Sequence, residues 1–221
     1  MIVIVAVGCA AEQPASPASD AAKPERKGTG EPQLKLQLAE PGISVPPLDA
    51  GRFQTNLPAG WKLLPRRSEY LLGAYEATPA GIPRLLVHVS DSPLDDVVDA
   101  ASAMQLQDAV RSELGDTTLA FPVQEIEIGD HYWVQYVRPA KYQNDAARQL
   151  ALETIQGGRR YKLELFVPKD DLLAQSSAAY RVAHDAQFLS SQAEKLTEPA
   201  TNEETSPDER KPDAPQPVEE S

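Results

Sequence analysis

Three histidines, His88, His131 and His184, are the side chains in this sequence best suited to metal binding or to proton transfer near neutral pH. None stands near another at the short spacing typical of a metal site, so we expect neither a metal ion nor a cofactor. Asp130 and His131 fall at a predicted hairpin turn, where a structural role is the commoner one and ligand binding is the alternative. His88 and His184 are expected to be half-buried structural residues.

Covalent catalysis requires a nucleophile within reach of a base, and the sequence offers no recognised pattern for one. It has no G-x-S-x-G, P-loop or G-x-G-x-x-G phrase, and its Gly157-Gly158 pair stands between two alternating runs, as in a hairpin turn. Asp95, Asp96 and Asp99 crowd the start of a predicted helix, where acids stabilise the helix dipole. We therefore assign no catalytic residue and predict that the protein is not an enzyme.

Trp61 and Trp133 are candidate binding residues, because large aromatic side chains dominate many protein interfaces. Trp61 follows a Pro-Ala-Gly turn, and we expect its ring to close one end of the core; an exposed contact for a partner is the competing view. Tyr132 and Trp133 are neighbours in a predicted strand, so their rings point to opposite faces. At least one of these two rings is therefore exposed or covered by a helix.

Two successive β-hairpins in residues 123–167 position most of these candidates. Each joins two runs of alternating apolar and polar residues through a two-residue turn, Gly129-Asp130 or Gly157-Gly158, and such turns favour residues that tolerate positive φ. In the last run Tyr161, Leu163, Leu165 and Val167 share one face, and Arg160, Lys162 and Glu164 share the other. We expect the hairpins to form the middle of a single sheet with one buried and one wet face.

Further strands and two helices complete the predicted domain. Apolar alternation and turn residues place strands at 52–57, 70–77 and 84–90. A first helix is expected to begin at Ser92 and to end at Gly115, and a second to cover residues 169–189. Hairpin-linked strands form an antiparallel sheet, and helices packed on such a sheet give an α+β fold.

The charge balance bears on the partner. The chain has 221 residues, a formal net charge of -12 and a pI near 4.7. A protein that binds nucleic acid presents a cationic face, so this balance argues against nucleic acid. Half of the net charge lies in residues 192–221, where nine acidic side chains face three basic ones. The arginine pairs at 66–67 and 159–160 leave an anionic-ligand site open as an alternative to a solvated edge.

Cys9, the only cysteine, is the candidate lipid-attachment residue. It follows the apolar run M-I-V-I-V-A-V-G, which is too short to span a bilayer, since that takes about 20 residues. This run, Gly-Cys and a Pro-, Ala- and Ser-rich segment together resemble the lipobox of bacterial lipoproteins, with Ala6 where that family prefers Leu. The resemblance implies a membrane anchor on Cys9; a cytosolic chain with an apolar start is the alternative.

Composition divides the chain into four parts. Residues 1–9 are expected to be a signal-peptide remnant, 10–49 a flexible linker, 50–191 the folded domain, and 192–221 an acidic disordered tail. Neither residues 10–32 nor the tail has the apolar periodicity that would offset the entropy lost on ordering. Leu34, Leu36 and Leu38 alternate with polar residues, which leaves a short edge strand open there.

The phrase F-Q-T-N-L-P-A-G-W at residues 53–61 resembles the opening strand and turn of the PsbP-like superfamily, and the element order in residues 50–191 is also similar. That superfamily contains the PsbP subunit of photosystem II, a yeast Ran-binding release factor and bacterial lipoproteins. The resemblance implies a PsbP-like α/β sandwich, in which helices pack on an antiparallel sheet. It transfers no activity, because members bind different partners and a fold does not fix a function.

We therefore expect a non-catalytic, lipid-anchored protein of the bacterial cell envelope that faces the periplasm or the exterior. Its domain would bind or assemble with an envelope protein whose identity the sequence does not give. A small-molecule- or metal-binding lipoprotein is the alternative, and a hydrolytic enzyme ranks third. The candidate binding residues are Trp61, Trp133, Asp130 and His131.

Overall fold

The computed structural model describes residues 34–143 and 145–189. Its elements are β1 (Pro41–Leu48), the 3-10 turn η1 (Asp49–Gly51), β2 (Phe53–Pro58), β3 (Lys62–Leu63), β4 (Leu72–Tyr75), β5 (Arg84–Asp91), α1 (Ala100–Leu114), β6 (Phe121–Ile128), β7 (His131–Tyr142), β8 (Asp145–Gln156), β9 (Arg159–Pro168), α2 (Leu172–His184) and β10 (Gln187–Phe188). The paired strands are antiparallel and the helices pack on them, so the fold is α+β, as predicted.

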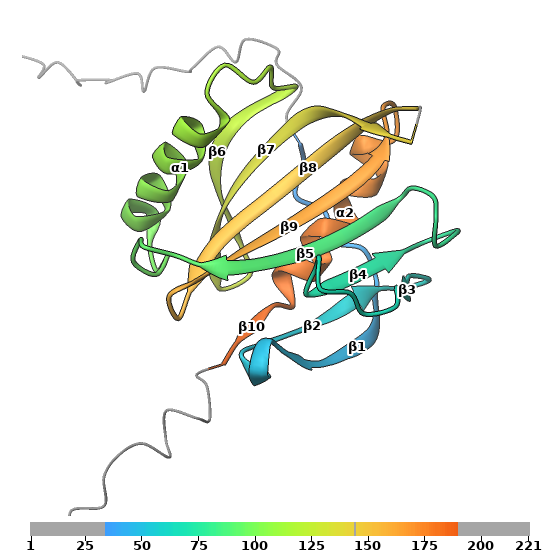
Figure 1. The fold of residues 1–221 in the computed structure, drawn as a ribbon, viewed down its shortest axis with the longest axis horizontal. Coiled ribbons are helices and arrows are strands. Elements are labelled where there is room, and N and C mark those ends of the chain that lie inside the picture. The colour runs from blue at the N-terminus through green and yellow to red at the C-terminus, as the bar shows by residue number, and fades with distance from the viewer. Residues whose placement is uncertain (1–33, 144, 190–221) are drawn as a thin grey trace, which may run out of the picture. The chain divides into compact units, whose positions relative to one another are not determined.

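Seven strands form one sheet in the order β3-β4-β5-β9-β8-β7-β6, and three form a second in the order β1-β2-β10 (Figure 1). Both predicted hairpins are present, β6–β7 and β8–β9. The turn residues Gly129, Gly157 and Gly158 have φ values of 62°, 59° and 68°, which such turns require. The first hairpin is not in the middle of the sheet, because β6 is its last strand; β5 pairs with β9 and so places the second hairpin at the centre.

The main core lies between α2, β2 and one face of the seven-stranded sheet. The four predicted inward side chains of β9 are 2% exposed or less: Tyr161, Leu163, Leu165 and Val167. Phe53 of β2 stacks on Tyr161 with ring centroids 5.4 Å apart. The predicted alternation of β9 is therefore correct, and it decides which face of the sheet carries the main core.

A smaller core lies beneath α1, on the opposite face of the sheet. Leu106 and Val110 of the helix pack with Val134 and Ile155 of β7 and β8, and all four are buried. The helix lies across the β6–β7 end of the sheet, which leaves part of this face uncovered by helix (Figure 1).

Helix α1 begins at Ala100 and not, as predicted, at Ser92. Asp99 caps it, since its carboxylate accepts a hydrogen bond from the Ser102 N–H at 2.8 Å and Ser102 Oγ accepts one from the Asp99 N–H at 3.1 Å. Asp96 instead accepts hydrogen bonds from both N–H groups of the β8–β9 turn, at 2.8 and 2.9 Å. The segment before α1 is thus held to a turn that lies far away in the sequence.

Helix α2 ends at His184, whereas the predicted helix continued to residue 189. Gln187 and Phe188 form β10 and pair with β2. The Phe188 ring lies 5.8 Å from Phe53 and 5.0 Å from Tyr161, measured between centroids. The extended backbone of β10 brings the Phe188 ring to the core, where a continued helix would not place it.

The folded part begins before the predicted start near Ala50. Strand β1 pairs with β2, and Leu34 and Val45 lie in the main core with 8% and 2% exposure. Residues 34–49 therefore belong to the folded part and not to the predicted linker. Cys9, the rest of that linker and the predicted tail lie outside the described residues.

Candidate functional site

The two predicted site residues at the first hairpin turn, Asp130 and His131, line an open pocket of about 500 Å³. His184 and Asp185 at the end of α2 line it too, with Asn56 of β2 and the 186–189 segment. The fold thus joins the predicted pair to two further polar side chains at the end of a helix.

Asp185 fixes the orientation of the His184 ring. Its Oδ1 lies 2.8 Å from His184 Nδ1, and the carboxylate accepts hydrogen bonds from Asn56 Nδ2 and Arg181 Nη1, both at 2.9 Å. Burial raises the pKa of Asp185, but these three hydrogen bonds lower it more, so its pKa lies below the ordinary value. A carboxylate oxygen accepts and does not donate, so His184 Nδ1 is the donor in this contact, and no described residue makes a hydrogen bond to Nε2.

The turn that carries Asp130 and His131 packs directly on His184. A Cβ atom on Gly129 would lie 3.1 Å from the His184 carbonyl oxygen and 3.4 Å from its ring Cδ2. On the other side, the His131 ring meets Phe188 edge to face, with centroids 4.9 Å apart and an interplanar angle of 81°. These two contacts hold His131 and His184 in one pocket although 53 positions separate them in the sequence.

The pocket combines polar and apolar side chains. It offers two imidazoles, the Asp130 carboxylate and the apolar side chains of Phe188 and Leu189. Among the described residues, its lining includes no Ser, Thr, Cys or Lys side chain that could act as a nucleophile. Within residues 34–143 and 145–189, no three His, Cys, Asp or Glu side chains are placed to share a metal ion.

The two tryptophans named as candidate binding residues are both in the main core. Trp61 is 5% exposed and Trp133 1% exposed. The Trp133 ring lies 6.2 Å from Phe188, and its buried Nε1 has no hydrogen-bond partner among the described residues. We therefore drop Trp61 and Trp133 as direct contacts for a partner, because a partner cannot reach rings that the fold already covers.

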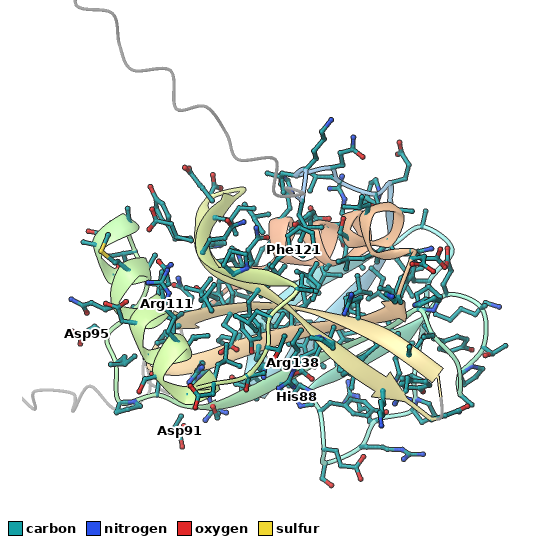
Figure 2. The ribbon with its side chains drawn as sticks, turned by 90° about the horizontal axis from the view of Figure 1, so that it is seen from above. His88, Asp91, Asp95, Arg111, Phe121 and Arg138 are labelled. Carbon is teal, nitrogen blue, oxygen red and sulfur yellow. The ribbon has the colours of Figure 1, made fainter. Side chains whose placement is uncertain are left out.

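The face of the sheet on which α1 lies was predicted to be largely wet, but the smaller core buries part of it. The rest of this face carries a charge network that we did not assign to a site from the sequence. Figure 2 shows one member of this network, His88 of β5, together with Arg138 of β7 on the side of the sheet away from α2. Arg160 and Lys162 of β9, predicted to face this way, flank Glu153 of β8. The alternation of β9 predicted that Arg160 and Lys162 lie on this face. That they meet Glu153 follows only from the register of β8 and β9.

Glu153 is the buried centre of this network, with a side chain 1% exposed. Arg160 Nη2 lies 2.6 Å from Glu153 Oε2, and the Tyr136 hydroxyl donates to Oε1 at 2.8 Å. Arg160 also makes two hydrogen bonds to Glu113 of α1, at 2.6 and 2.8 Å. The hydrogen bonds to Glu113 raise the pKa of Arg160 above its ordinary value. One guanidinium therefore ties α1 to the sheet.

His88 joins the network through Glu164. Its Nε2 lies 3.4 Å from Glu164 Oε2, and its Nδ1 lies 2.9 Å from the Glu69 carbonyl oxygen. The Glu164 contact raises the pKa of His88 above its ordinary value, against the effect of burial. Burial raises the pKa of Glu164, but His88 and Lys162 have the larger, opposite effect and lower this pKa to about 2. Each acid in this network thus has a cationic neighbour, as in a structural ion-pair cluster.

The predicted lipid-attachment residue, Cys9, lies outside the described residues, so its anchor stays a prediction. Among the helices that are described, neither is long and apolar enough to cross a membrane.

Comparison with known proteins gives structural likenesses only. No family model matches the sequence, and no curated protein matches it. A protein from Bacteroides thetaiotaomicron is similar over 69% of this chain, with 11% identity and a TM-score of 0.48; the match spans 50% of that protein. Cyanobacterial PsbP from Synechocystis is similar over 67% of this chain and 96% of its own, with 13% identity and a TM-score of 0.42. LpqN, described as involved in cell envelope biogenesis of Mycobacterium tuberculosis, is similar over 62% and 83%, with 15% identity and a TM-score of 0.45.

PsbP, after which the superfamily resembled by residues 53–61 is named, is thus among the similar structures. At this level of identity the likenesses concern the arrangement of elements, and they assign no role to a residue of this chain.

Proposed function

We propose that the protein is a non-catalytic binding module of the bacterial cell envelope, anchored by lipid on Cys9, and that it recognises an envelope protein through the pocket around His131 and His184. The domain would work as an assembly partner held off the membrane by the segment before it.

The pocket is the observation that carries the binding role. Its two imidazoles come from a turn and a helix end that are packed together, so the polar groups are positioned before a partner arrives. Phe188 supplies an apolar wall beside them. A concave site that combines a few oriented polar groups with an apolar wall is typical of a binding site.

Site-specific photo-crosslinking tests the binding role. A benzoylphenylalanine in place of Asp130 should form a light-dependent adduct with one envelope protein in intact membranes, because the exposed turn borders the pocket. The matched control carries the same probe at Lys141, the exposed residue near the other end of β7. An adduct of the same size and yield at both positions, or none at Asp130, would overturn the assignment of this pocket.

Lipid attachment is tested separately. Cys9→Ala should move the protein from the membrane fraction to the soluble fraction without changing its thermal unfolding, because the cores described in residues 34–189 do not include Cys9. Equal membrane retention of both forms would remove the anchor from the proposal and leave the pocket untouched.

A small molecule or a metal ion is the second candidate ligand, favoured by the free Nε2 that the Asp185 contact gives His184. A ligand that binds only the folded state raises the melting temperature. Zinc, nickel, copper and a panel of anions would be added to the wild type and to His184→Ala. A rise that His184→Ala abolishes would support this candidate over a protein partner.

A further inference from the structure

A small apolar pocket lies between an edge strand of each sheet. Strand β1 is at the edge of the three-stranded sheet and β3 at the edge of the seven-stranded one. The pocket has a volume of about 120 Å³, and its lining includes Pro46, Leu48, Leu63, Arg66, Tyr70 and Leu71. An apolar cavity of roughly 150 Å³ holds one benzene molecule, so this pocket has room for one large apolar side chain.

The wall of this pocket is fixed in the folded chain. The Tyr70 hydroxyl donates a hydrogen bond to the Pro65 carbonyl oxygen at 2.6 Å. A Cβ atom on Gly73 would lie 2.7 Å from Tyr70 Cε2, so the bare glycine lets the ring lie against β4. Tyr70 and Leu72 are 8% and 4% exposed. A partner side chain therefore meets a preformed surface and has little ordering cost to overcome.

Among the described residues, no strand pairs with β3 on the side away from β4, so Leu63 offers a strand edge beside the pocket. Lys62 pairs with Tyr75, and the N–H of Leu64 donates to the Gly73 carbonyl oxygen at 2.8 Å. Antiparallel pairing alternates along a strand, so the N–H and C=O of Leu63, between these two, point away from β4. The Leu63 side chain is 42% exposed and lines the pocket. Its outward backbone groups can pair with an added strand.

The surroundings of Leu63 are cationic on an acidic protein. Lys62, Arg66 and Arg67 lie in residues 61–75, where Glu69 is the only acid, while the whole chain has a net charge of -12. Within the part of the chain that the structure describes, none of these three cations takes part in an ion pair. Their charges are thus available to an acidic partner.

We infer that this pocket and the Leu63 edge together bind an extended, acidic peptide segment of a partner protein. One apolar side chain of the segment enters between Leu48 and Tyr70, its backbone pairs with Leu63, and its flanking carboxylates approach Arg66 and Lys62. This is recognition by strand addition, in which the backbone supplies affinity and a pocket supplies specificity. The site is separate from the pocket around His131, and the inference does not depend on it.

The size of the pocket and the free edge favour a peptide over a lipid. A cavity for one side chain holds only a short stretch of an acyl chain, and the N–H and C=O of Leu63 have no use for an acyl chain. An extended peptide uses the cavity, the edge and the charges at once.

The test uses the full chain and a fluorescein-labelled decapeptide with one central leucine between aspartates and glutamates. Fluorescence anisotropy should show saturable binding with a Kd below about 1 mM. Replacing the leucine of the peptide by serine should weaken binding at least about tenfold, since one apolar anchor is lost. N-methylation of alternate backbone nitrogens should abolish binding, because it removes the strand pairing and keeps every side chain.

Two protein variants and their controls complete the test. Leu63→Asp and Arg66→Glu should each weaken binding about tenfold, while Val98→Asp, at a side chain 72% exposed on another part of the surface, and Lys141→Glu should not. All four positions are exposed, so the thermal unfolding of the variants serves as the check on folding.

Three results would overturn the inference. The first is no saturable binding of the leucine peptide, and the second is binding that N-methylation leaves unchanged. The third is a different occupant, which could be found in two ways. Vesicles of phosphatidylcholine and phosphatidylglycerol would bind the wild type but not Arg66→Glu, while the leucine peptide does not bind. Alternatively, a synthetic peptide of residues 192–221 would displace the labelled peptide. The first of these occupants would assign the site to a lipid surface, and the second to the tail of this chain.

Discussion

Replacing Arg160 by Met should destabilise the fold strongly, because it takes from a buried carboxylate its closest cation. The Glu153 side chain is 1% exposed, and Arg160 Nη2 lies 2.6 Å from its Oε2, whereas Lys162 Nζ lies 3.8 Å from its Oε1. Breaking a buried ion pair from one side costs roughly 3–5 kcal/mol of the free energy of unfolding. The Glu113 side chain at the other end of Arg160 is 56% exposed, so that contact adds about 0–1 kcal/mol.

Urea unfolding at pH 7 measures this cost in four proteins: the wild type, Arg160→Met, Glu153→Gln, and the double variant. The double variant removes the buried charge together with its partner, and the amide oxygen that Glu153→Gln introduces can still accept a hydrogen bond from the Tyr136 hydroxyl. It should therefore recover most of the stability that Arg160→Met loses. Glu113→Gln is the control for the exposed end and should cost less than about 1 kcal/mol.

Two outcomes would refute this reasoning. A loss below about 1 kcal/mol for Arg160→Met would show that Glu153 does not need the guanidinium, contrary to the cost of a buried unpaired charge. A double variant as unstable as Arg160→Met would show that the guanidinium acts through α1 and not through the carboxylate.

Three other contacts lead to predictions of their own. Trp61→Ala should cost roughly 3–5 kcal/mol in urea unfolding, as for other large buried aromatics, and a cost under about 0.5 kcal/mol would contradict its place in the core. NMR titration should place the pKa of His88 above its ordinary value of 6.5, and Glu164→Gln should lower that pKa. Since the pKa of His88 is higher in the folded state, protonated His88 stabilises the fold fully at pH values below its unfolded-state pKa. This stabilisation is lost as the pH rises through its folded-state pKa. A difference in the free energy of unfolding between wild type and His88→Gln that grows with pH would contradict this. Gly129→Ala should destabilise more than Gly157→Ala, because both glycines have positive φ but only Gly129 lies against His184; equal costs in urea unfolding would show that the contact contributes nothing.

Local sequence information was sufficient for the two hairpins. Each hairpin is specified by a two-residue turn and by the runs on either side of it, so its pairing could be predicted. The alternation within β9 also gave the two faces of that strand. Tyr161 and Leu163 face the core, while Arg160 and Lys162 face the network around Glu153.

The elements that were predicted wrongly depend on contacts far apart in the sequence. Ser92 and the acids after it have the pattern of a helix start, but Asp96 binds a turn 61 positions away and keeps that segment out of α1. Phe188 has the spacing of a helical residue, but its ring packs on Phe53 of β2. Neither partner could be identified from the local pattern, because the pattern carries no information on which segments meet.

The candidate site divides in the same way. Asp130 and His131 could be named from the sequence because the hairpin turn itself is a local signal. His184 and Asp185 could not, because only the packing of α2 on the sheet brings the end of the helix to that turn. Gly129 is required at its position for two reasons, its positive φ and the close approach of His184. The hairpin turn alone already accounts for a glycine there, so the sequence held no sign of the second reason.

Both proposed binding sites depend on the short three-stranded sheet, which the sequence pattern did not predict. Asn56 of β2 and Phe188 of β10 line the pocket around His131, and Leu48 of β1 lines the apolar pocket beside Leu63. The large sheet is held by its own hairpins and by two cores, so it can serve as a rigid support. The short sheet meets it at two places and makes a pocket at each one. Binding residues that lie on small elements over a rigid scaffold can change without loss of the fold, which is why the well-predicted strands indicate so little about function.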